Sequence, residues 1–317
     1  MKIGHSYSKM NLIPSGRASD KVVEGCLVLE GGAFRGLYTQ GLLDSWMQND
    51  MNIRTVMGVS AGALSAVAYV SGQIGRSARA NLGYRHDTNY IGVDALRRAH
   101  SLINIDFLIK DFDRIEPLDL ERFYSPSRRL VAVATNCDTG RPEFFDRDSC
   151  SDMMAALKAS ASMPFISPMV KVDGIPCLDG GCSCAIPFRR AIEQGYGKIV
   201  VIKTRDRSFR IPNAATGSVA RKVYRRHQEF ALSLDEADVR YNRDLDELDR
   251  LEEEGRLLIV QPSEPVNIKR VEGDMEKLGK LYWLGYDDGL KSLQRVRSYL
   301  EDGVSGVQDV KAHCPEL

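Results

Sequence analysis

Residues 53–70 read IRTVMGVSAGALSAVAYV and combine an apolar strand pattern, a sharp turn and an apolar helix pattern. The run 53–57 predicts the strand and the run 63–70 predicts a buried helix. Between them, Gly58-Val59-Ser60-Ala61-Gly62 has the G-x-S-x-G pattern of a nucleophile elbow, in which Gly58 and Gly62 leave room for the turn. The turn would lift the Ser60 hydroxyl to the helix N-terminus, where the helix dipole favours developing negative charge. The alternative is a turn of small residues with an idle serine.

The sequence on both sides of this elbow alternates strand and helix patterns. The predicted strands are 26–30, 53–57, 130–135, 198–203 and 257–260, and the predicted helices include 37–46, 63–70 and 151–160. Residues 143–145 are expected to pair with 130–135, and 170–177 read as a hairpin around Asp173-Gly174. Apolar strands separated by helices predict an α/β fold, a three-layer α/β/α sandwich with a mostly parallel central sheet.

We divide the chain into an N-terminal extension (1–24), a core (25–204) and a mostly helical C-terminal region that packs on the core (205–317). Two segments depart from the alternating pattern. Residues 74–121 carry no clear strand and read as an insertion or lid over a site. Residues 205–226 are basic and precede an acidic helical stretch that runs to 254, which indicates solvated helix faces of opposite charge. The alternative for 205–226 is a basic patch for lipid headgroups.

Composition excludes several classes of protein. Of 317 residues, 43% are hydrophobic, and 43 basic residues balance 43 acidic ones, so the net charge lacks the basic excess of a dedicated nucleic-acid binder. The same balance weighs against simple electrostatic attachment to anionic lipid. No apolar run approaches the ~18 residues of a transmembrane helix, and the first twenty residues lack the apolar region of a secretory signal. We therefore expect a cytoplasmic protein, with peripheral membrane contact as an open alternative.

The cysteines fit this expectation. Their odd number, seven, suits reduced thiols better than a disulfide framework. Cys177, Cys182 and Cys184 cluster, but the spacing C-x4-C-x-C differs from the paired C-x2-C that is usual for structural zinc. We expect packing residues here and no metal.

A glycine-rich loop, Glu30-Gly31-Gly32-Ala33-Phe34-Arg35-Gly36, joins the first predicted strand to the first predicted helix. Consecutive glycines let backbone N–H groups converge on one point, which an oxyanion hole requires. A phosphate or a dinucleotide could use the same arrangement. Ala33 occupies the middle glycine of the G-x-G-x-x-G pattern, and no acidic residue stands at a strand end about 20 residues on. The dinucleotide interpretation is therefore disfavoured.

A serine hydroxyl needs a base to become a nucleophile. None of the five histidines, His5, His86, His100, His227 and His313, follows an apolar strand in a turn, which is where a triad histidine is expected. Asp179, in Cys177-Leu178-Asp179-Gly180-Gly181, is the better candidate because it ends a strand-like segment. Gly180 and Gly181 leave room there for a strained turn and a close backbone approach. The alternative is a plain turn aspartate, which is how we interpret Asp173.

These three blocks, in this order, resemble those of the patatin-like phospholipases. The blocks are Gly31–Gly36, Gly58–Gly62 and Asp179–Gly181, and residues 158–164, KASASMP, are similar to that family's serine-rich segment. The resemblance covers roughly 25–204, and the C-terminal third resembles a bacterial subgroup less specifically. Glu30 stands where an aspartate is common in the family, and Ala33 replaces a glycine.

The resemblance implies a Ser–Asp dyad. Ser60 would attack an ester carbonyl, Asp179 would take its proton, and N–H groups of Gly32, Ala33 and Phe34 would hold the oxyanion. Arg35 would orient that loop or meet a phosphate. Water would then hydrolyse the acyl-enzyme, again with Asp179 as the base. No metal or organic cofactor is required.

We therefore expect a serine acyl hydrolase whose partner is a lipid acyl ester, a phospholipid or a lysophospholipid, with no nucleic-acid partner. An acyltransferase or thioesterase using the same acyl-enzyme is the first alternative. A non-catalytic protein that binds phosphate or nucleotide at Gly31–Gly36 is the second. The apolar residues of the lid-like segment would line an acyl groove or form an ordinary core helix; they are Ile103, Ile105, Phe107, Leu108, Ile109 and Phe112.

Overall fold

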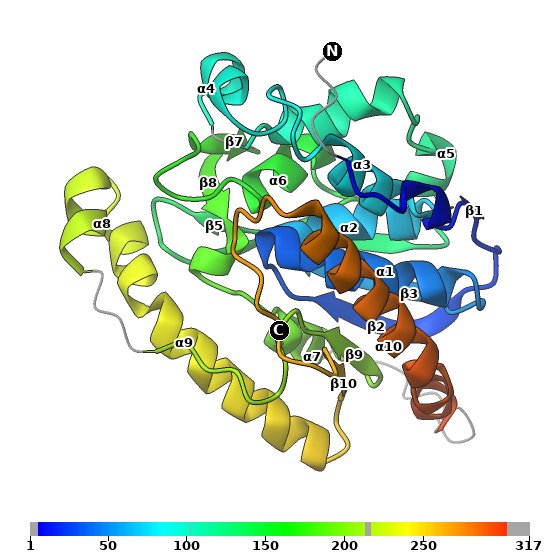
Figure 1. Cartoon of the computed structure of the whole chain (residues 1–317). Coiled ribbons are helices and arrows are strands. Elements are labelled where there is room, and N and C mark those ends of the chain that lie inside the picture. Colours follow the sequence, from blue (N-terminus) through cyan, green and yellow to red (C-terminus); the bar gives the residue numbers. More distant parts are fainter. Residues whose placement is uncertain (1–5, 102, 213–216, 303–317) are drawn as a thin grey trace.

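The computed structural model describes residues 6–101, 103–212 and 217–302 (Figure 1). The strand order of the main sheet is β10-β9-β2-β3-β5-β8-β7, and β6 also pairs with β5. Neighbours from β10 to β5 run parallel, whereas β6, β8 and β7 are antiparallel to their partners. The predicted mostly parallel sheet is therefore confirmed. The strands are β2 (Val23–Leu29), β3 (Ile53–Val59), β5 (Arg129–Asn136), β6 (Pro142–Asp146), β7 (Val170–Val172), β8 (Ile175–Asp179), β9 (Ile199–Ile202) and β10 (Leu258–Val260).

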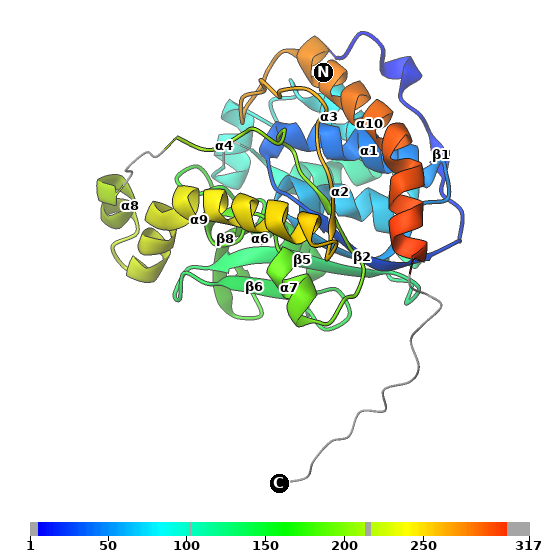
Figure 2. The same cartoon turned by 90° about the horizontal axis from the view of Figure 1, so that it is seen from below.

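Alternation along the strands divides the core between two layers of helices. On β2, Leu27 and Leu29 face one apolar cluster, whereas Cys26 and Val28 face the other. The first cluster is covered by α1 (Gly36–Met47), α2 (Ala61–Val70), α3 (Arg76–Tyr84), α6 (Met153–Ser160) and α10 (Met275–Glu301). The second is covered by α7 (Phe188–Glu193) and α9 (Gln228–Glu253), which lie below the sheet in Figure 1 and nearest the viewer in Figure 2. The three-layer sandwich that the sequence predicts is confirmed.

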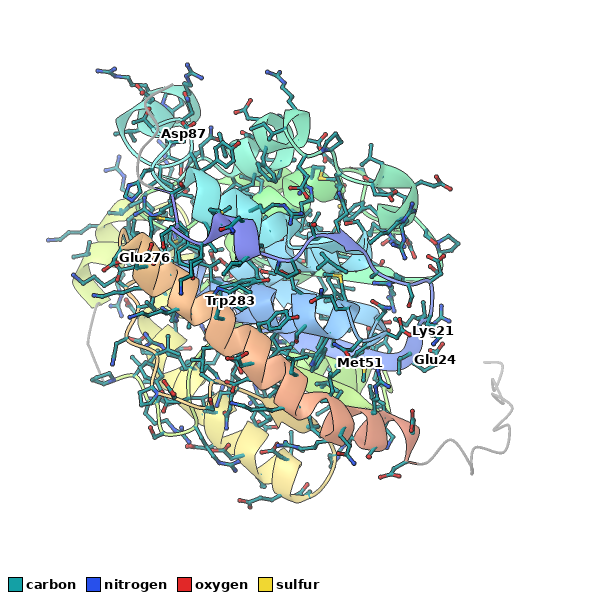
Figure 3. The ribbon with its side chains drawn as sticks, turned by 45° about the vertical axis from the view of Figure 1, so that its right-hand side comes forward. Lys21, Glu24, Met51, Asp87, Glu276 and Trp283 are labelled. Carbon is teal, nitrogen blue, oxygen red and sulfur yellow. The ribbon has the colours of Figure 1, made fainter. Side chains whose placement is uncertain are left out.

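The C-terminal helix α10 packs closely along α1 and can be followed in Figure 3 by Glu276 and Trp283. A Cβ added at Gly285 would lie 1.9 Å from the Tyr38 carbonyl oxygen, so the two helix backbones almost touch. The Tyr282 hydroxyl donates to Asp44 across this contact at 2.8 Å. Residues after 204 therefore contribute both a sheet strand, β10, and a covering helix. In the part of the chain that the structure describes, no helix is long and apolar enough to cross a membrane.

The lid-like segment is built from short helical pieces rather than strands. It contains α3, α4 (Val93–Ala99), the π-helical turn η3 (Phe107–Asp111), the 3-10 turn η4 (Phe112–Arg114) and α5 (Leu120–Phe123), and it follows a small pairing of β1 (Gly16–Arg17) with β4 (Gln73–Ile74). Its apolar residues divide between both predicted roles. Phe107 and Phe112 are buried in the core beside Tyr84, whereas Ile103, Ile105 and Leu108 line a pocket described below.

The basic segment and the acidic helix face each other. Arg210 pairs with Asp246 at 2.9 Å, and Arg207 pairs with Glu252 on the same helix, α9, at 3.0 Å. Arg221, on α8 (Gly217–Val223), pairs with Asp235 at 3.2 Å. The basic segment is therefore paired with α9 at these arginines, and Arg207 and Arg210 lie before α8 rather than on a solvated helix face.

Candidate active site

Ser60 stands at the turn between β3 and α2 in a strained conformation, with φ 53° and ψ −122°. A positive φ is uncommon for a serine and must be held by its surroundings. The Ser60 N–H donates to the Ser160 hydroxyl at 2.8 Å, and that hydroxyl donates to the Val133 carbonyl at 2.6 Å. At Gly62 a Cβ would lie 2.6 Å from the Leu29 carbonyl oxygen, and Gly58 is crowded by α2 in the same way. A sharp strand-to-helix turn with Ser60 at its tip is therefore present and is held in place from both sides.

The Ser60 hydroxyl donates to the Asp179 carboxylate at 2.6 Å, although 119 positions separate the two residues. Asp179 is the last residue of β8 and begins the turn η5 (Gly180–Cys182). Its other carboxylate oxygen accepts the Gly181 N–H at 2.8 Å, and Gly180 passes so close to the Val133 carbonyl that a Cβ would be 2.2 Å away. Burial raises the pKa of Asp179 to about 6, against the hydrogen bonds from Ser60 and Gly181, which favour the charged form.

The loop before α1 passes directly beneath the serine. A Cβ at Gly31 would lie 3.2 Å from the Ser60 Cβ, and one at Gly36 would lie 2.9 Å from the Ala61 Cβ. Ala33 has a φ of 49°, a conformation that a glycine would adopt without strain. Within the described residues, the N–H groups of Gly32, Ala33 and Phe34 have no hydrogen-bond acceptor. They remain free to donate to an anionic atom.

Glu30 stands where an aspartate is common in the patatin-like phospholipases. It connects this loop to the segment after β9 and to α9. Its carboxylate accepts hydrogen bonds from the Thr204 backbone and hydroxyl and from the Tyr241 hydroxyl on α9. Arg35 lies beside it, and within the described residues its buried Nε has no hydrogen-bond partner. Burial lowers the pKa of Arg35, and the charge of Glu30 opposes this. Glu30 therefore organises the loop, whereas Arg35 keeps its Nε–H unused.

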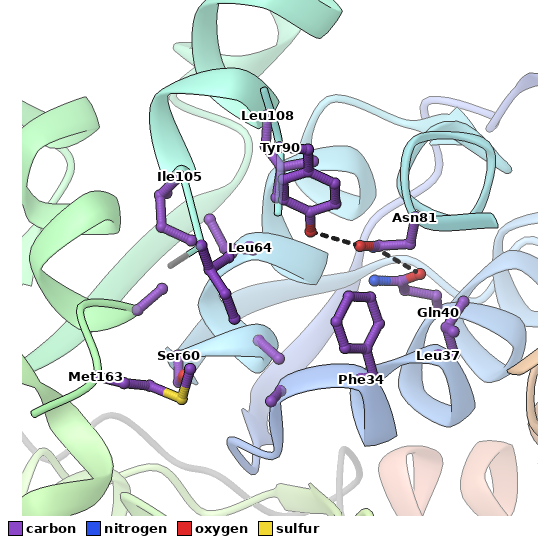
Figure 4. Close-up of a pocket in the computed structure, with 14 residues that line it drawn as sticks. Phe34, Leu37, Gln40, Ser60, Leu64, Asn81, Tyr90, Ile105, Leu108 and Met163 are labelled. Carbon is purple, nitrogen blue, oxygen red and sulfur yellow. Dashed lines mark hydrogen bonds between the residues drawn. The ribbon is translucent and has the colours of Figure 1, made fainter. Parts of the chain in front are cut away.

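A pocket opens in front of Ser60 (Figure 4). Its walls are mostly apolar and come from α1, α2, the lid-like segment and the turn after α6. One end is polar, because Tyr90 donates to Asn81 at 2.8 Å and Asn81 donates to Gln40 at 3.4 Å. The lining residues are Ala33, Phe34, Leu37, Gln40, Ser60, Ala61, Leu64, Asn81, Tyr90, Ile103, Ile105, Leu108, Ala161 and Met163.

A second pocket shares Gln40, Leu64, Asn81 and Leu108 with the first and extends past Ile109. The two pockets are therefore neighbours, and apolar side chains of both lie on either side of Leu64 and Leu108.

The histidines that the structure describes lie elsewhere. His86 contacts the Gly273 carbonyl, His227 contacts Asp138, and His100 is exposed, so none of these lines the pocket. His5 and His313 lie outside the described residues. Asp173 is at the hairpin turn, where it accepts from Ser151.

Sequence reasoning missed several residues that shape this site. Ser160 lay in the serine-rich segment, but nothing in the pattern indicated its hydrogen bond to the elbow. Thr135, whose hydroxyl donates to the Asp179 carbonyl oxygen at 2.8 Å, gave no signal. The polar end of the pocket joins Gln40, Asn81 and Tyr90 from three segments, so no local motif could predict it.

Comparison with known proteins agrees with the motif blocks. The family model for patatin-like phospholipase matches residues 27–192, more than half of the chain, and a model for a domain of unknown function (DUF6363) matches 226–301. The chain is 31% identical over 183 residues to the uncharacterized protein YjjU of Escherichia coli (strain K12), with 56% of this chain and 51% of that protein covered. It is 27% identical over 183 residues to the probable lipid hydrolase 463L of Invertebrate iridescent virus 6, with 53% and 63% covered. The chain thus spans about half to two thirds of these relatives' lengths.

Two solved structures are similar over most of this chain. VipD from Legionella pneumophila has a TM-score of 0.46 at 13% identity, with 92% of this chain and 73% of that chain covered. ExoU from Pseudomonas aeruginosa, in complex with SpcU, has a TM-score of 0.39 at 14% identity, with 87% and 54% covered.

Proposed function

The chain belongs to the patatin-like phospholipase family, and from this premise we propose that it is a serine hydrolase that cleaves fatty-acyl esters of phospholipids or lysophospholipids. One observation carries the proposal. The Ser60 hydroxyl, on a strained elbow at the head of an apolar pocket, donates directly to the buried Asp179 carboxylate at 2.6 Å. A nucleophile and a base within hydrogen-bond reach are the minimum that covalent acyl transfer requires.

In the proposed reaction, Ser60 Oγ attacks the ester carbonyl while its proton moves to Asp179. The carbonyl oxygen becomes an oxyanion that accepts the free N–H groups of the Gly32–Phe34 turn. As the intermediate collapses, the carbon–oxygen bond to the alcohol breaks and Asp179 returns the proton to the departing oxygen. Water then attacks the acyl-enzyme with Asp179 again as the base, which releases the fatty acid and restores Ser60.

Burial gives Asp179 a strength suited to this task. An exposed carboxylate with a pKa near ~4 is a weak base at neutral pH. The pKa of Asp179 is raised to about 6 by burial, so the group is still mostly ionised at pH 7 but holds a proton more firmly. A general base works best when its pKa lies near the operating pH.

The mostly apolar lining of the pocket supports a lipid substrate. With an ester carbonyl at Ser60, the acyl chain would lie against Leu64 and Leu108, which also line the second pocket. The name of the viral relative, a probable lipid hydrolase, agrees with this substrate class.

The proposal is tested by covalent labelling with a fluorophosphonate and by fatty-acid release from phosphatidylcholine and lysophosphatidylcholine. Wild-type protein should take up one label, located on Ser60 by peptide mass spectrometry, and Ser60→Ala should lose both labelling and hydrolysis. Ser65→Ala removes a nearby hydroxyl that donates to the Ala61 carbonyl and accepts a long hydrogen bond, 3.4 Å, from the Gln40 amide; it does not contact Asp179, so this variant should keep both. Wild-type protein that takes up no label, or Ser60→Ala that hydrolyses at more than about a tenth of the wild-type rate, would show that Ser60 is not the nucleophile.

A further inference from the structure

Several segments around the mouth of the Ser60 pocket expose apolar side chains next to basic ones. The first segment is α4. The chain leaves the pocket lining at Tyr90, forms α4 and returns to the pocket lining at Ile103. On α4 the Leu96 side chain is 47% exposed, and exposed Arg97 and Arg98 follow it directly. An aliphatic residue and a pair of cations are thus presented to solvent beside the entrance.

The second segment is the turn after α6. Met163 lines the pocket, and two residues later Phe165 is 53% exposed. Phe165 has a φ of 68°, which is unfavourable for a bulky residue. Its N–H donates to the Tyr224 hydroxyl at 2.7 Å, and the two rings lie 5.4 Å apart. The structure therefore holds an aromatic ring in solvent at a conformational cost.

The third segment is α8, which Tyr224 joins to Phe165. Ala220 and Tyr224 are buried on one side of this helix, whereas Val219 and Val223 are 58% and 55% exposed on the other. Lys222 is exposed as well. It lies three positions after Val219 and therefore neighbours it on the same face of the helix. Figures 1 and 2 show α8 standing out from the body of the molecule, with α4 also at its periphery.

The fourth segment is the strap of residues 261–274 between β10 and α10. Lys269, Arg270 and Val271 are exposed on it. The strap is fixed beside the pocket, because Arg85 donates to the Glu272 carbonyl at 2.6 Å and stacks over the ring of Phe34, a pocket residue. The charge of Arg270 also favours the ionised form of Asp179 and so opposes the effect of burial on that pKa.

We propose that these four segments form a docking surface for a lipid bilayer that contains anionic lipids. The exposed apolar side chains would enter the interface, and the cations would contact headgroup phosphates. Acidic side chains are present on two of the segments, Asp94 on α4 and Glu264, Glu272 and Asp274 on the strap, so the excess of positive charge lies mainly on α8 and on exposed Arg225 and Arg226, which follow it. Within the described residues, the cations of the surface make no ion pair apart from Arg97 and Arg221; those without one are Arg98, Lys222, Arg225, Arg226, Lys269 and Arg270.

Docking in this orientation would place the pocket entrance against the bilayer. An acyl ester could then reach Ser60 without its chains crossing water, which is the unfavourable step for a long-chain lipid. The inference rests on the proposed function for its substrate, but the surface itself can be tested without any turnover.

The test measures sedimentation of Ser60→Ala protein with vesicles. The vesicles contain phosphatidylcholine alone or with about a third phosphatidylglycerol. We expect binding to the anionic vesicles, weaker binding to phosphatidylcholine, and release by about 0.5 M NaCl, which screens exposed charges. Lys222→Gln, Arg225→Gln and Arg226→Gln combined in this background should reduce the partition coefficient about tenfold or more. Phe165→Asn, which tolerates the positive φ, should reduce it as well.

A matched control removes three cations from the opposite end of the parallel strands. Lys198 and Arg256 precede β9 and β10, and Arg297 donates to the Asn49 carbonyl before β3. Lys198→Gln, Arg256→Gln and Arg297→Gln combined should bind within about twofold of Ser60→Ala protein. Thermal unfolding confirms that each variant is folded. Equal losses in both triple variants, or equal binding to both vesicle types, would contradict the docking surface. A missing Ser60 label in the earlier experiment would contradict the proposed function and leave the vesicle result intact.

Discussion

Replacing Asp179 by asparagine tests the proposed base with little change in shape. The carboxylate accepts two hydrogen bonds, one from the Ser60 hydroxyl and one from the Gly181 N–H. An asparagine can keep the second bond only by turning its oxygen toward Gly181. Its NH2 group then faces Ser60, and this group can neither accept a proton nor orient the hydroxyl as a donor. The variant should therefore fold normally and lose the base.

The expected loss follows from what a positioned base contributes. General base catalysis is worth about 10² to 10⁴ in rate. We expect Asp179→Asn to slow acylation about a thousandfold, which corresponds to about 4 kcal/mol in activation free energy. Asp173→Asn is the control, because Asp173 is an exposed hairpin residue with a φ of 50°, which asparagine also tolerates. It should change the rate less than about twofold.

The assay is single-turnover acylation by a soluble p-nitrophenyl ester, followed by release of p-nitrophenol in a stopped-flow instrument. With enzyme in excess, the signal reports the step in which Ser60 is acylated and excludes deacylation. The reasoning is refuted if Asp179→Asn acylates within about tenfold of wild type. It is also refuted if Asp173→Asn is the slower variant.

Three further predictions concern pH and stability. The acylation rate should rise with pH with a midpoint of about 6, because Asp179 must be ionised and burial raises its pKa to about 6. Arg270→Gln should move this midpoint to higher pH, because the charge of Arg270 favours the ionised carboxylate. A midpoint of ~4 would indicate an exposed carboxylate and contradict the prediction. Burial raises the pKa of Asp44 to about 7, so between pH ~4 and this value the folded state keeps a proton on Asp44 that the unfolded state releases. The free energy of unfolding should therefore fall by up to about 4 kcal/mol as the pH rises from about 4 to about 7. Measured by urea unfolding, the free energy of unfolding of Asp44→Asn should fall less over this pH range. If it falls as much as that of wild type, Asp44 is not the cause of the pH dependence. Gly285→Ala places a Cβ 1.9 Å from the Tyr38 carbonyl oxygen and should lower the free energy of unfolding by about 3 kcal/mol. Gly197→Ala is the control, because its Cβ meets no atom within 4 Å; in the same assay it should change the free energy of unfolding by less than about 0.5 kcal/mol.

The sheet was predictable because its signals are local. Each buried strand is a short apolar run bounded by turn residues, and the elbow places strand, turn and helix within residues 53–70. The hairpin around Asp173-Gly174 follows from turn residues that accept a positive φ. The pairing of the Ser60 hydroxyl with Asp179 spans 119 positions, and ordered motif blocks indicated it rather than any local pattern.

Other features depend on contacts that no window of sequence contains. The hydrogen bond from Tyr282 to Asp44 spans 238 positions, and it joins helices whose close approach depends on glycines that look ordinary in sequence. The lid-like segment gave no clear pattern because its short helices are stabilised by tertiary packing, such as Phe107 against Tyr90 at 5.1 Å, rather than by helix propensity. Its division between core and pocket could not be read from hydrophobicity alone.

Net charge, likewise, could not reveal the proposed docking surface. A total of zero weighed against electrostatic membrane attachment, yet it sums over cations in different surroundings. Arg207 and Arg210 are bound by carboxylates of α9, whereas Lys222 on α8 lies between two exposed valines. Attraction to an anionic surface falls off within about a Debye length, ~8–10 Å, so only charges that face the bilayer contribute. The proposed membrane affinity, which the vesicle experiment tests, would therefore depend on the distribution of charge around the pocket entrance rather than on its sum.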